Sequence, residues 1–243
     1  MNAALANPAR YVHEVRATRG ALEALPPGLA AAAPVRIAVD GEEIARLLPP
    51  GAVHQGIAVR VEPLEDVALG EALDPPAGLA IMLDQVSDPQ NAGAIFRTAA
   101  AFGARAVIQQ DRHSAPVTGV VAKAAAGALE LVADVRVTNL SQAIRTAQDL
   151  GWRVVGLAGE AEQSLSAVLD ATPTLLVLGA EGRGLRDLVG RSCDALGRIE
   201  IAPQMESLNV SVAAGIALAF AAQAQGGVAA GHTAAPQARP SGS

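Results

Sequence analysis

Three separated segments of the chain carry side chains that could act together in one reaction. They are Asn91-Ala-Gly93-Ala-Ile-Phe-Arg97, Leu178-Gly179-Ala-Glu181-Gly182-Arg-Gly184-Leu185 and Ser207-Leu208-Asn209-Val-Ser211. Each places amide, carboxylate, hydroxyl or guanidinium groups within otherwise apolar sequence. Polar groups in such places are unfavourable unless they bind something, so their recurrence predicts one shared pocket. An arginine among them would bind a phosphate or a carboxylate.

The first segment is expected to open a helix after a strand. Asp88 or Asn91 would cap this helix, and Pro89 suits its first turn. Gly93 inside the first turn costs about 1 kcal/mol relative to alanine unless something approaches the helix closely. Arg97 follows four residues later on the same helical face. The spacing is as compatible with a ligand at the helix mouth as with a capped loop and a solvent-facing Arg97.

The second segment is a strand that ends in a glycine-rich loop. It lacks the G-x-G-x-x-G spacing of a dinucleotide site and the Gly-Lys-Ser/Thr of a P-loop, which excludes both of these nucleotide-binding classes here. Glycines at the end of a strand let the main chain approach a planar ligand closely. A plain turn with a surface Glu181 is the alternative, but three glycines around one acid favour a ligand.

The third segment reads as a strand at Arg198–Ile201, a loop and the start of a helix. Ser207 or Asn209 would cap that helix. Two polar side chains around Leu208 exceed what one cap requires, and Ser211 adds a third. These extra groups favour a binding role.

Other polar residues give weaker signals. The four histidines, His13, His54, His113 and His232, show no metal-ligand spacing, so no metal is expected. Arg112, His113 and Lys123 flank a loop that would either contact RNA or remain solvated. The single Cys193 excludes an internal disulfide. It is expected to be a buried apolar residue, because nothing beside it would stabilise a thiolate.

The composition describes a globular protein. Of the 243 residues, 51% are hydrophobic and 17% charged, and five aromatic residues leave a core of Ala, Val, Leu and Ile. The net charge of −6 argues mildly against a nucleic-acid binder, although a local basic cluster can bind phosphate on an acidic protein. No run of ~18 apolar residues offers a membrane span, and no signal peptide is recognisable. A cytoplasmic protein without a membrane partner is expected.

Prolines and a glycine at Leu73–Gly78 predict a linker. The expected parts are a small domain of residues 1–73, a linker of residues 74–78, a main domain of residues 79–225 and a disordered tail of residues 226–243. The small domain would hold helices at 17–25 and 41–48 and strands at 35–39 and 56–61. The main domain would hold strands at 79–83, 106–109, 135–138, 152–157 and 174–178, and helices at 91–102, 119–126, 140–150, 165–169 and 209–224. This alternation predicts a parallel α/β sheet with its ligand at the carboxyl ends of the strands.

The three segments resemble, in the same order, the three motifs of the SpoU (TrmH-like) branch of the SPOUT methyltransferases. The resemblance covers roughly Val35 to Ala224. In detail the chain is similar to bacterial 23S rRNA guanosine 2′-O-methyltransferases of the RlmB type. The further matching segments are His54-Gln55-Gly56, Asp111 to Pro116, Lys123-Ala-Ala-Ala-Gly127-Ala and Val137-Thr138-Asn139-Leu140.

This resemblance implies an α/β trefoil-knot domain that binds S-adenosylmethionine and methylates a ribose 2′-hydroxyl of RNA. The implied cofactor-binding residues are Leu178, Gly179, Gly184, Ile199 and Leu208. The implied catalytic residues are Asn91, Arg97, Glu181, Ser207 and Asn209, and the implied RNA-binding residues are Arg97, Arg112, His113 and Lys123. A homodimer would bring Arg97 of one subunit near the other's cofactor.

The resemblance also implies a ribosomal-protein-like RNA-binding module in the small domain. Relatives usually begin with a short strand before the helix that holds Asn7 and Pro8, so this domain is expected to lack its first strand. The implied substrate is a guanosine of 23S rRNA. A tRNA guanosine and a non-catalytic RNA-binding or ribosome-assembly role are the alternatives.

Overall fold

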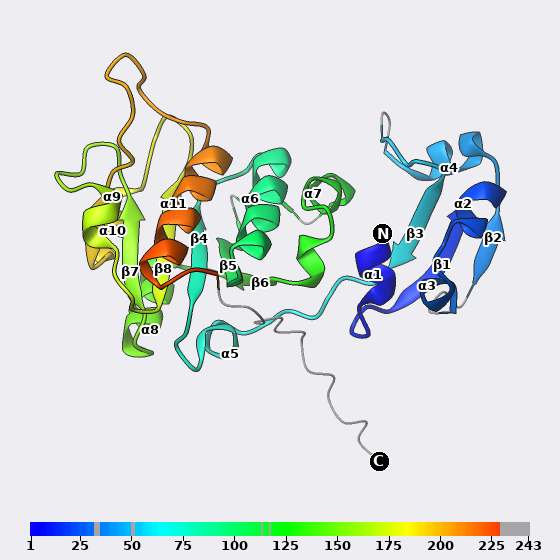
Figure 1. Ribbon diagram of the computed structural model, residues 1–243, viewed down its shortest axis with the longest axis horizontal. Coiled ribbons are helices and arrows are strands. Elements are labelled where there is room, and N and C mark those ends of the chain that lie inside the picture. The colour runs from blue at the N-terminus through cyan, green and yellow to red at the C-terminus, as the bar shows by residue number, and fades with distance from the viewer. Residues whose placement is uncertain (32–34, 50–51, 113, 117, 229–243) are drawn as a thin grey trace. The chain divides into compact units, whose positions relative to one another are not determined.

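The structure is a computed structural model that describes residues 1–31, 35–49, 52–112, 114–116 and 118–228. The described chain divides after Glu65 into two compact units, which are described separately below (Figure 1). Among the described residues, no helix combines the length and the apolar character needed to cross a bilayer.

The first unit is a three-stranded sheet with short helices. Strand β1 (Val12–Ala17) lies in the centre, parallel to β2 (Arg36–Ala38) and antiparallel to β3 (Ile57–Val61). The helices are α1 (Asn2–Ala6), α2 (Arg19–Glu23), α3 (Pro27–Ala31) and α4 (Gly41–Leu47). The sequence pattern did not predict β1. Its ladder shifts register between Val12 and Glu14, and this irregularity hides the alternation of apolar residues that identifies a strand.

The second unit contains a six-stranded sheet in which all pairings are parallel, in the order β6-β5-β4-β8-β7-β9. The strands are β4 (Leu79–Asp84), β5 (Ala104–Gln110), β6 (Ala133–Val137), β7 (Arg153–Leu157), β8 (Thr174–Gly179) and β9 (Ala195–Gly197). The helices are α5 (Leu69–Leu73), α6 (Pro89–Ala101), α7 (Gly119–Ala124), η1 (Ala128–Glu130), α8 (Leu140–Asp149), α9 (Leu165–Val168), α10 (Asp187–Ser192) and α11 (Val210–Ala224). The predicted parallel α/β sheet is therefore confirmed.

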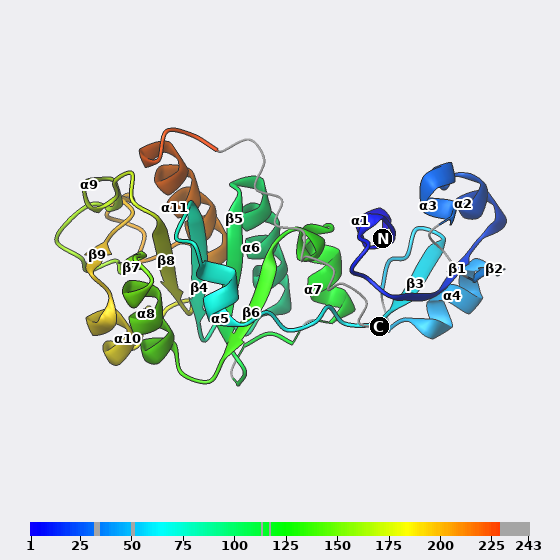
Figure 2. The ribbon, with the colours of Figure 1, turned by 90° about the horizontal axis from the view of Figure 1, so that it is seen from below.

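Helices cover both faces of this sheet, as Figure 2 shows for α6 and α11 on one side and α5 and α8 on the other. All six residues of β4 are buried, which explains its continuous apolar sequence. Phe96, Leu176 and Leu218 belong to the core under α6 and α11. Leu73 and Ile144 belong to the core on the opposite face. Loops follow the strands at their carboxyl ends.

The division between the units falls earlier than the sequence predicted. Helix α5 belongs to the second unit, because Ala72 and Leu73 are buried in its core. The indole nitrogen of Trp152 donates a hydrogen bond to the carbonyl of Leu73 at 2.8 Å. The small domain therefore ends near residue 65, and the predicted linker follows α5. The predicted tail lies outside the described residues from position 229 on.

The strand predicted at Arg198–Ile201 is wrong. Strand β9 lies three residues earlier, and Arg198 forms only an isolated bridge with Ser164. Gly197 lies so close to α9 that a Cβ atom there would meet the Cα of Leu165 at 2.9 Å. The alternating Ile-Glu-Ile pattern suggested a strand, but the main chain from residue 199 onward leaves the sheet as a loop.

Candidate active site

Helix α6 begins at the carboxyl end of β4 with a specific cap. The side chain of Asp88 accepts a hydrogen bond from the amide of Gln90 at 2.9 Å, and Pro89 is the first helical residue. Of the two caps predicted, Asp88 is therefore the one used. Asn91, which is only 9% exposed, is left with a side chain that can bind other groups.

Gly93 has a structural explanation. A Cβ atom at this position would lie 2.5 Å from the Cβ of Ala124 and 2.7 Å from the carbonyl oxygen of Val121. The glycine lets α6 and α7 approach each other closely. The expected close approach is therefore present, and the neighbour is a helix of the same unit.

The glycine loop after β8 folds back on itself. A Cβ at Gly179 would overlap the main chain of Gly184, and the amide of Gly184 donates to the carbonyl of Ala180 at 3.0 Å. Gly182 and Gly184 have φ angles of 71° and 64°, which favour glycine. Each glycine is thus required by the turn, and the turn carries Glu181 at its tip.

Helix α11 is capped by Asn209, not by Ser207. The side-chain oxygen of Asn209 accepts hydrogen bonds from the amide of Ser211 at 2.9 Å and from that of Val212 at 3.3 Å. The hydroxyl of Ser211 donates to the same oxygen at 2.6 Å. This leaves the amide nitrogen of Asn209 free to donate in another direction.

The three segments meet at Glu181. One of its carboxylate oxygens accepts hydrogen bonds from Asn209 Nδ2 at 2.6 Å, from Asn91 Nδ2 at 3.2 Å and from the amide of Val210 at 3.2 Å. Asn209 Nδ2 also donates to Asn91 Oδ1 at 3.0 Å. The positive end of the α11 dipole favours a carboxylate at this position. Asn91, Glu181 and Asn209, called the amide–carboxylate network below, therefore form one connected group.

Two predicted catalytic residues lie outside this network. Ser207 is exposed in the loop before α11, and Arg97 is exposed on α6. Neither side chain has a hydrogen-bond or ion-pair partner within the part of the chain that is described. Arg97 is six residues beyond Asn91, which is about 9 Å along a helix axis. The network therefore does not orient Arg97 of the same chain.

The predicted cofactor-binding residues lie at the end of β8 and in loops of the second unit. Leu178 is buried, whereas Ile199 and Leu208 are half-buried. Within the described residues, the main-chain N–H and C=O groups of Ile199 and Leu208 have no partner. A purine ring needs apolar walls and main-chain groups at its edge. Ile199 and Leu208 fit an adenosine group in both respects.

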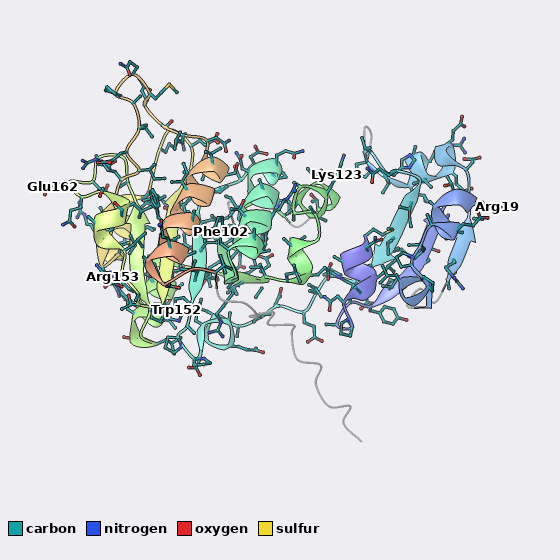
Figure 3. All side chains as sticks on the ribbon, viewed as in Figure 1. Arg19, Phe102, Lys123, Trp152, Arg153 and Glu162 are labelled. Carbon is teal, nitrogen blue, oxygen red and sulfur yellow. The ribbon has the colours of Figure 1, made fainter. Side chains whose placement is uncertain are left out.

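Besides Arg97, two of the predicted RNA-binding side chains are exposed. These are Arg112 and Lys123, and Lys123 projects from α7 (Figure 3). His113 lies outside the described residues. The loop between them is held at Ser114, whose hydroxyl accepts from Arg136 Nη1 at 2.7 Å. This contact fixes Ser114, which lies between the exposed cations Arg112 and Lys123 in the sequence.

Sequence reasoning missed Asp84 and Arg186. Asp84 is the last residue of β4, with a side chain that is 0% exposed, and Arg186 lies just beyond the glycine loop. Arg186 Nε contacts Asp84 Oδ1 at 2.7 Å, and the amide of Arg186 donates to Asp84 Oδ2 at 2.9 Å. The sequence signal for Asp84 was its position as a carboxylate at the end of a buried apolar run. Its partner, far along the chain, could not be read from the sequence.

Cys193 is half-buried, less than predicted, and its thiol donates to the carbonyl of Val189 at 3.3 Å. Burial, together with the nearby carboxylates of Asp194 and Asp84, raises the pKa of its thiol to about 12. The thiol therefore stays protonated and unreactive near neutral pH. Within the described part of the chain, no three His, Cys, Asp or Glu residues gather as metal ligands.

Comparisons with known proteins identify the family of this chain. Residues 78–219 match the SpoU rRNA Methylase family. An uncharacterized tRNA/rRNA methyltransferase from Mycobacterium ulcerans (strain Agy99) is 43% identical over 171 residues, which cover 69% of this chain and 55% of that protein. The chain thus spans about half the length of the curated relatives it matches.

Two solved structures extend the match to the fold. A TrmH-family RNA methyltransferase structure from Porphyromonas gingivalis has a TM-score of 0.70 at 28% identity and covers 90% of this chain and 85% of its own. An AdoMet-bound rRNA methyltransferase from Sinorhizobium meliloti has a TM-score of 0.73 at 25% identity, covering 88% and 80%.

Proposed function

Because the chain belongs to the SpoU rRNA Methylase family, we propose that it transfers a methyl group from S-adenosylmethionine to a ribose 2′-hydroxyl of RNA. The observation that carries this proposal is the meeting of Asn91, Glu181 and Asn209, from three separate segments, in one hydrogen-bonded network. This network lies at the carboxyl ends of the parallel strands, where such sheets bind their ligands.

The cofactor is held by main-chain groups near Gly179, Ile199 and Leu208. S-adenosylmethionine supplies a sulfonium methyl group that a ribose oxygen can attack in line. The protein's contribution is positioning, which can supply much of the rate enhancement. The amide–carboxylate network offers a carboxylate and two amides to orient the ribose. The proton leaves the 2′-hydroxyl for a neighbouring RNA phosphate or water.

Arg97 acts on the RNA phosphate next to the reacting ribose. Arginine remains protonated in proteins, so it serves as a cation and not as a base. Its planar group can hold a phosphate through two hydrogen bonds and polarise the nearby hydroxyl. An Arg97→Lys enzyme with unchanged turnover and unchanged RNA affinity would contradict this role.

Arg97 serves the active site of a second copy of the chain. Helix α11 packs beside α6, as Figure 1 shows, and exposes an apolar stripe at helical spacing. Val212 is 51% exposed, Phe220 is 38% exposed, and Ile216 lies between them. A stripe that the unit leaves uncovered suits a symmetric dimer contact. Such a contact along α6 and α11 brings Arg97 to the partner.

Mixing two impaired variants tests this arrangement. In a mixed dimer of Arg97→Ala and Asn209→Ala subunits, one of the two sites regains both residues if Arg97 acts in trans. Random pairing then restores about a quarter of the wild-type activity. If Arg97 acts within its own chain, every site keeps one substitution and the mixture is no more active than the average of the two variants. Each variant mixed with itself is the matched control.

The proposal also includes a trefoil knot, in which the chain passes through one of its own loops. The loop from Ala158 to Leu165 binds residues 197 and 198 at several points. Arg198 donates to the carbonyls of Ala161 and Glu162, its amide donates to Gln163, and its carbonyl accepts from Leu165. These contacts support a trefoil knot in which the later chain passes through this loop. An experimental chain trace without that passage would contradict the knot.

The proposed target is a guanosine of 23S rRNA in the cytoplasm. Exposed Arg112 and Lys123 supply phosphate contacts beside the active site. In the first unit, Tyr11 is 62% exposed and meets His13 edge-on, and such rings can stack on unpaired bases. The assay is transfer of labelled methyl groups to unmodified 23S rRNA and to bulk tRNA. Label in tRNA alone would overturn the target, and transfer to neither RNA would favour a non-catalytic binding role.

A further inference from the structure

The glycine loop that carries Glu181 is tied to the sheet by a buried ion pair. Asp84 ends β4, and its ladder partner in β8 is Gly179, the residue at which the loop begins. The same Asp84 binds Arg186, which directly follows the loop. The buried carboxylate of Asp84 therefore lies beside Gly179, where the loop begins, and binds Arg186, the residue that follows the loop.

The contact is made by both the main chain and the side chain of Arg186. Its amide donates to Asp84 Oδ2 at 2.9 Å and its Nε donates to Oδ1 at 2.7 Å. Its Nη2 reaches Gln110 Oε1, at the end of β5, at 2.8 Å. The guanidinium thus links the loop to two neighbouring strand ends. Charge-assisted hydrogen bonds to a fully buried carboxylate are stronger than neutral ones.

The loop itself has few other restraints. Residues 181–184 are exposed, and an isolated bridge joins Ala180 to Gly184. Two glycines with positive φ angles add conformational freedom that must be lost when the loop is ordered. Without the ion pair, the loop would be restrained mainly by this turn and by the contacts of Glu181.

We propose that Asp84 and Arg186 form a latch that holds the loop in its cofactor-binding shape and aims Glu181 at Asn91 and Asn209. Both are positioning residues, since they act through the loop. This inference rests on the proposed function, because it takes the loop as part of the S-adenosylmethionine site. Arg186 also binds Gln110, which lies two residues before Arg112, so the same side chain contacts the strand end next to a proposed RNA-binding residue.

The first test measures amide hydrogen exchange in the cofactor-free protein. The variants are Arg186→Gln, Arg186→Lys and the double variant Asp84→Asn/Arg186→Gln, which leaves no unpaired buried charge. Amides of residues 180–186 should exchange about tenfold faster in Arg186→Gln, while β4 and β8 remain protected. In Arg186→Lys these amides should exchange at a rate between those of the wild type and Arg186→Gln. A lysine ammonium can bind Asp84 but cannot reach Gln110 as well.

The second test measures S-adenosylmethionine affinity by titration calorimetry at a temperature where every variant is folded. Arg186→Gln should weaken binding by about tenfold to a hundredfold, in line with the loss of one or two charge-assisted hydrogen bonds. The double variant should bind as weakly as Arg186→Gln, because either change opens the same latch. The matched control is Asp170→Asn, which removes an ion pair with Arg153 elsewhere in the unit and should bind normally.

The outcomes separate the latch from the proposed function. Unchanged exchange in residues 180–186 overturns the latch, whatever the affinity. Faster exchange with wild-type affinity overturns its role in cofactor binding. A wild-type protein that binds no S-adenosylmethionine overturns the proposed function, and the exchange data then decide independently whether Asp84 and Arg186 hold the loop.

Discussion

Replacing Asn209 by serine should separate two roles of this side chain. Its oxygen caps α11, and its nitrogen donates to Glu181 at 2.6 Å and to Asn91 at 3.0 Å. Serine caps a helix about as well as asparagine but has no amide group to reach Glu181. Asn209→Ser should therefore keep the helix and lose the network.

The expected magnitudes differ for stability and for catalysis. Glu181 is exposed, so water can replace the lost donor, and stability should change by less than about 0.5 kcal/mol. Asn209→Ala loses the cap as well, about 1 kcal/mol, or roughly 2–4 °C in Tm. For catalysis, a reacting group displaced by about 1 Å can lose up to a hundredfold in rate. Turnover should fall by about tenfold to a hundredfold in both variants.

The assay compares single-turnover methyl transfer with thermal unfolding for the wild type and the two variants. Asn209→Ser should be nearly as stable as the wild type and nearly as slow as Asn209→Ala. If Asn209→Ser transfers methyl groups at the wild-type rate, the network does not position the reacting groups. If the methyl-transfer rate of Asn209→Ser falls only as far as its loss of stability explains, then Asn209 acts only as the cap of α11.

Three further predictions concern packing and ionisation in the second unit. Gly93→Ala should destabilise by about 1–3 kcal/mol, since its Cβ would lie 2.5 Å from Ala124; an unchanged Tm would contradict the close contact of α6 and α7. Cys193 should resist alkylation at pH 8 in the native state and react in urea, because burial raises the pKa of its thiol to about 12; rapid native labelling would contradict this. Hydrogen bonds from Thr172 and the charge of Arg153 lower the pKa of Asp170 below 3.8, so its contribution to stability is present above that pH and lost as the pH falls further. Asp170→Asn should therefore lower Tm at pH 7 but not near pH 2, and an equal effect at both pH values would refute this linkage.

Local sequence patterns predicted most of the second unit. The continuous apolar run of β4 and the alternation of strands and helices were sufficient for the parallel sheet. Polar groups in apolar surroundings identified Asn91, Glu181 and Asn209, which the fold brings within hydrogen-bond distance. Their catalytic roles stay predictions, as do those of Arg97 and Ser207.

Other features could not be read from local patterns. The pairing of Asp84 with Arg186 depends on strand order, which places residues distant in sequence at one sheet edge. The glycines gave an ambiguous signal, because Gly93 serves helix packing and Gly179 serves a turn. Strand β1 was hidden by the register shift in its ladder, and the domain boundary was displaced because α5 contributes Leu73 to the second core.

The most direct test of the central claim identifies the atom that receives the methyl group. Unmodified 23S rRNA would be incubated with the protein and with S-adenosylmethionine labelled in its methyl carbon, then digested to nucleosides for mass spectrometry. We expect a guanosine whose label stays with the ribose fragment, as a 2′-O-methyl group. Label that stays with a base fragment would contradict the proposed chemistry at the Asn91, Glu181 and Asn209 site.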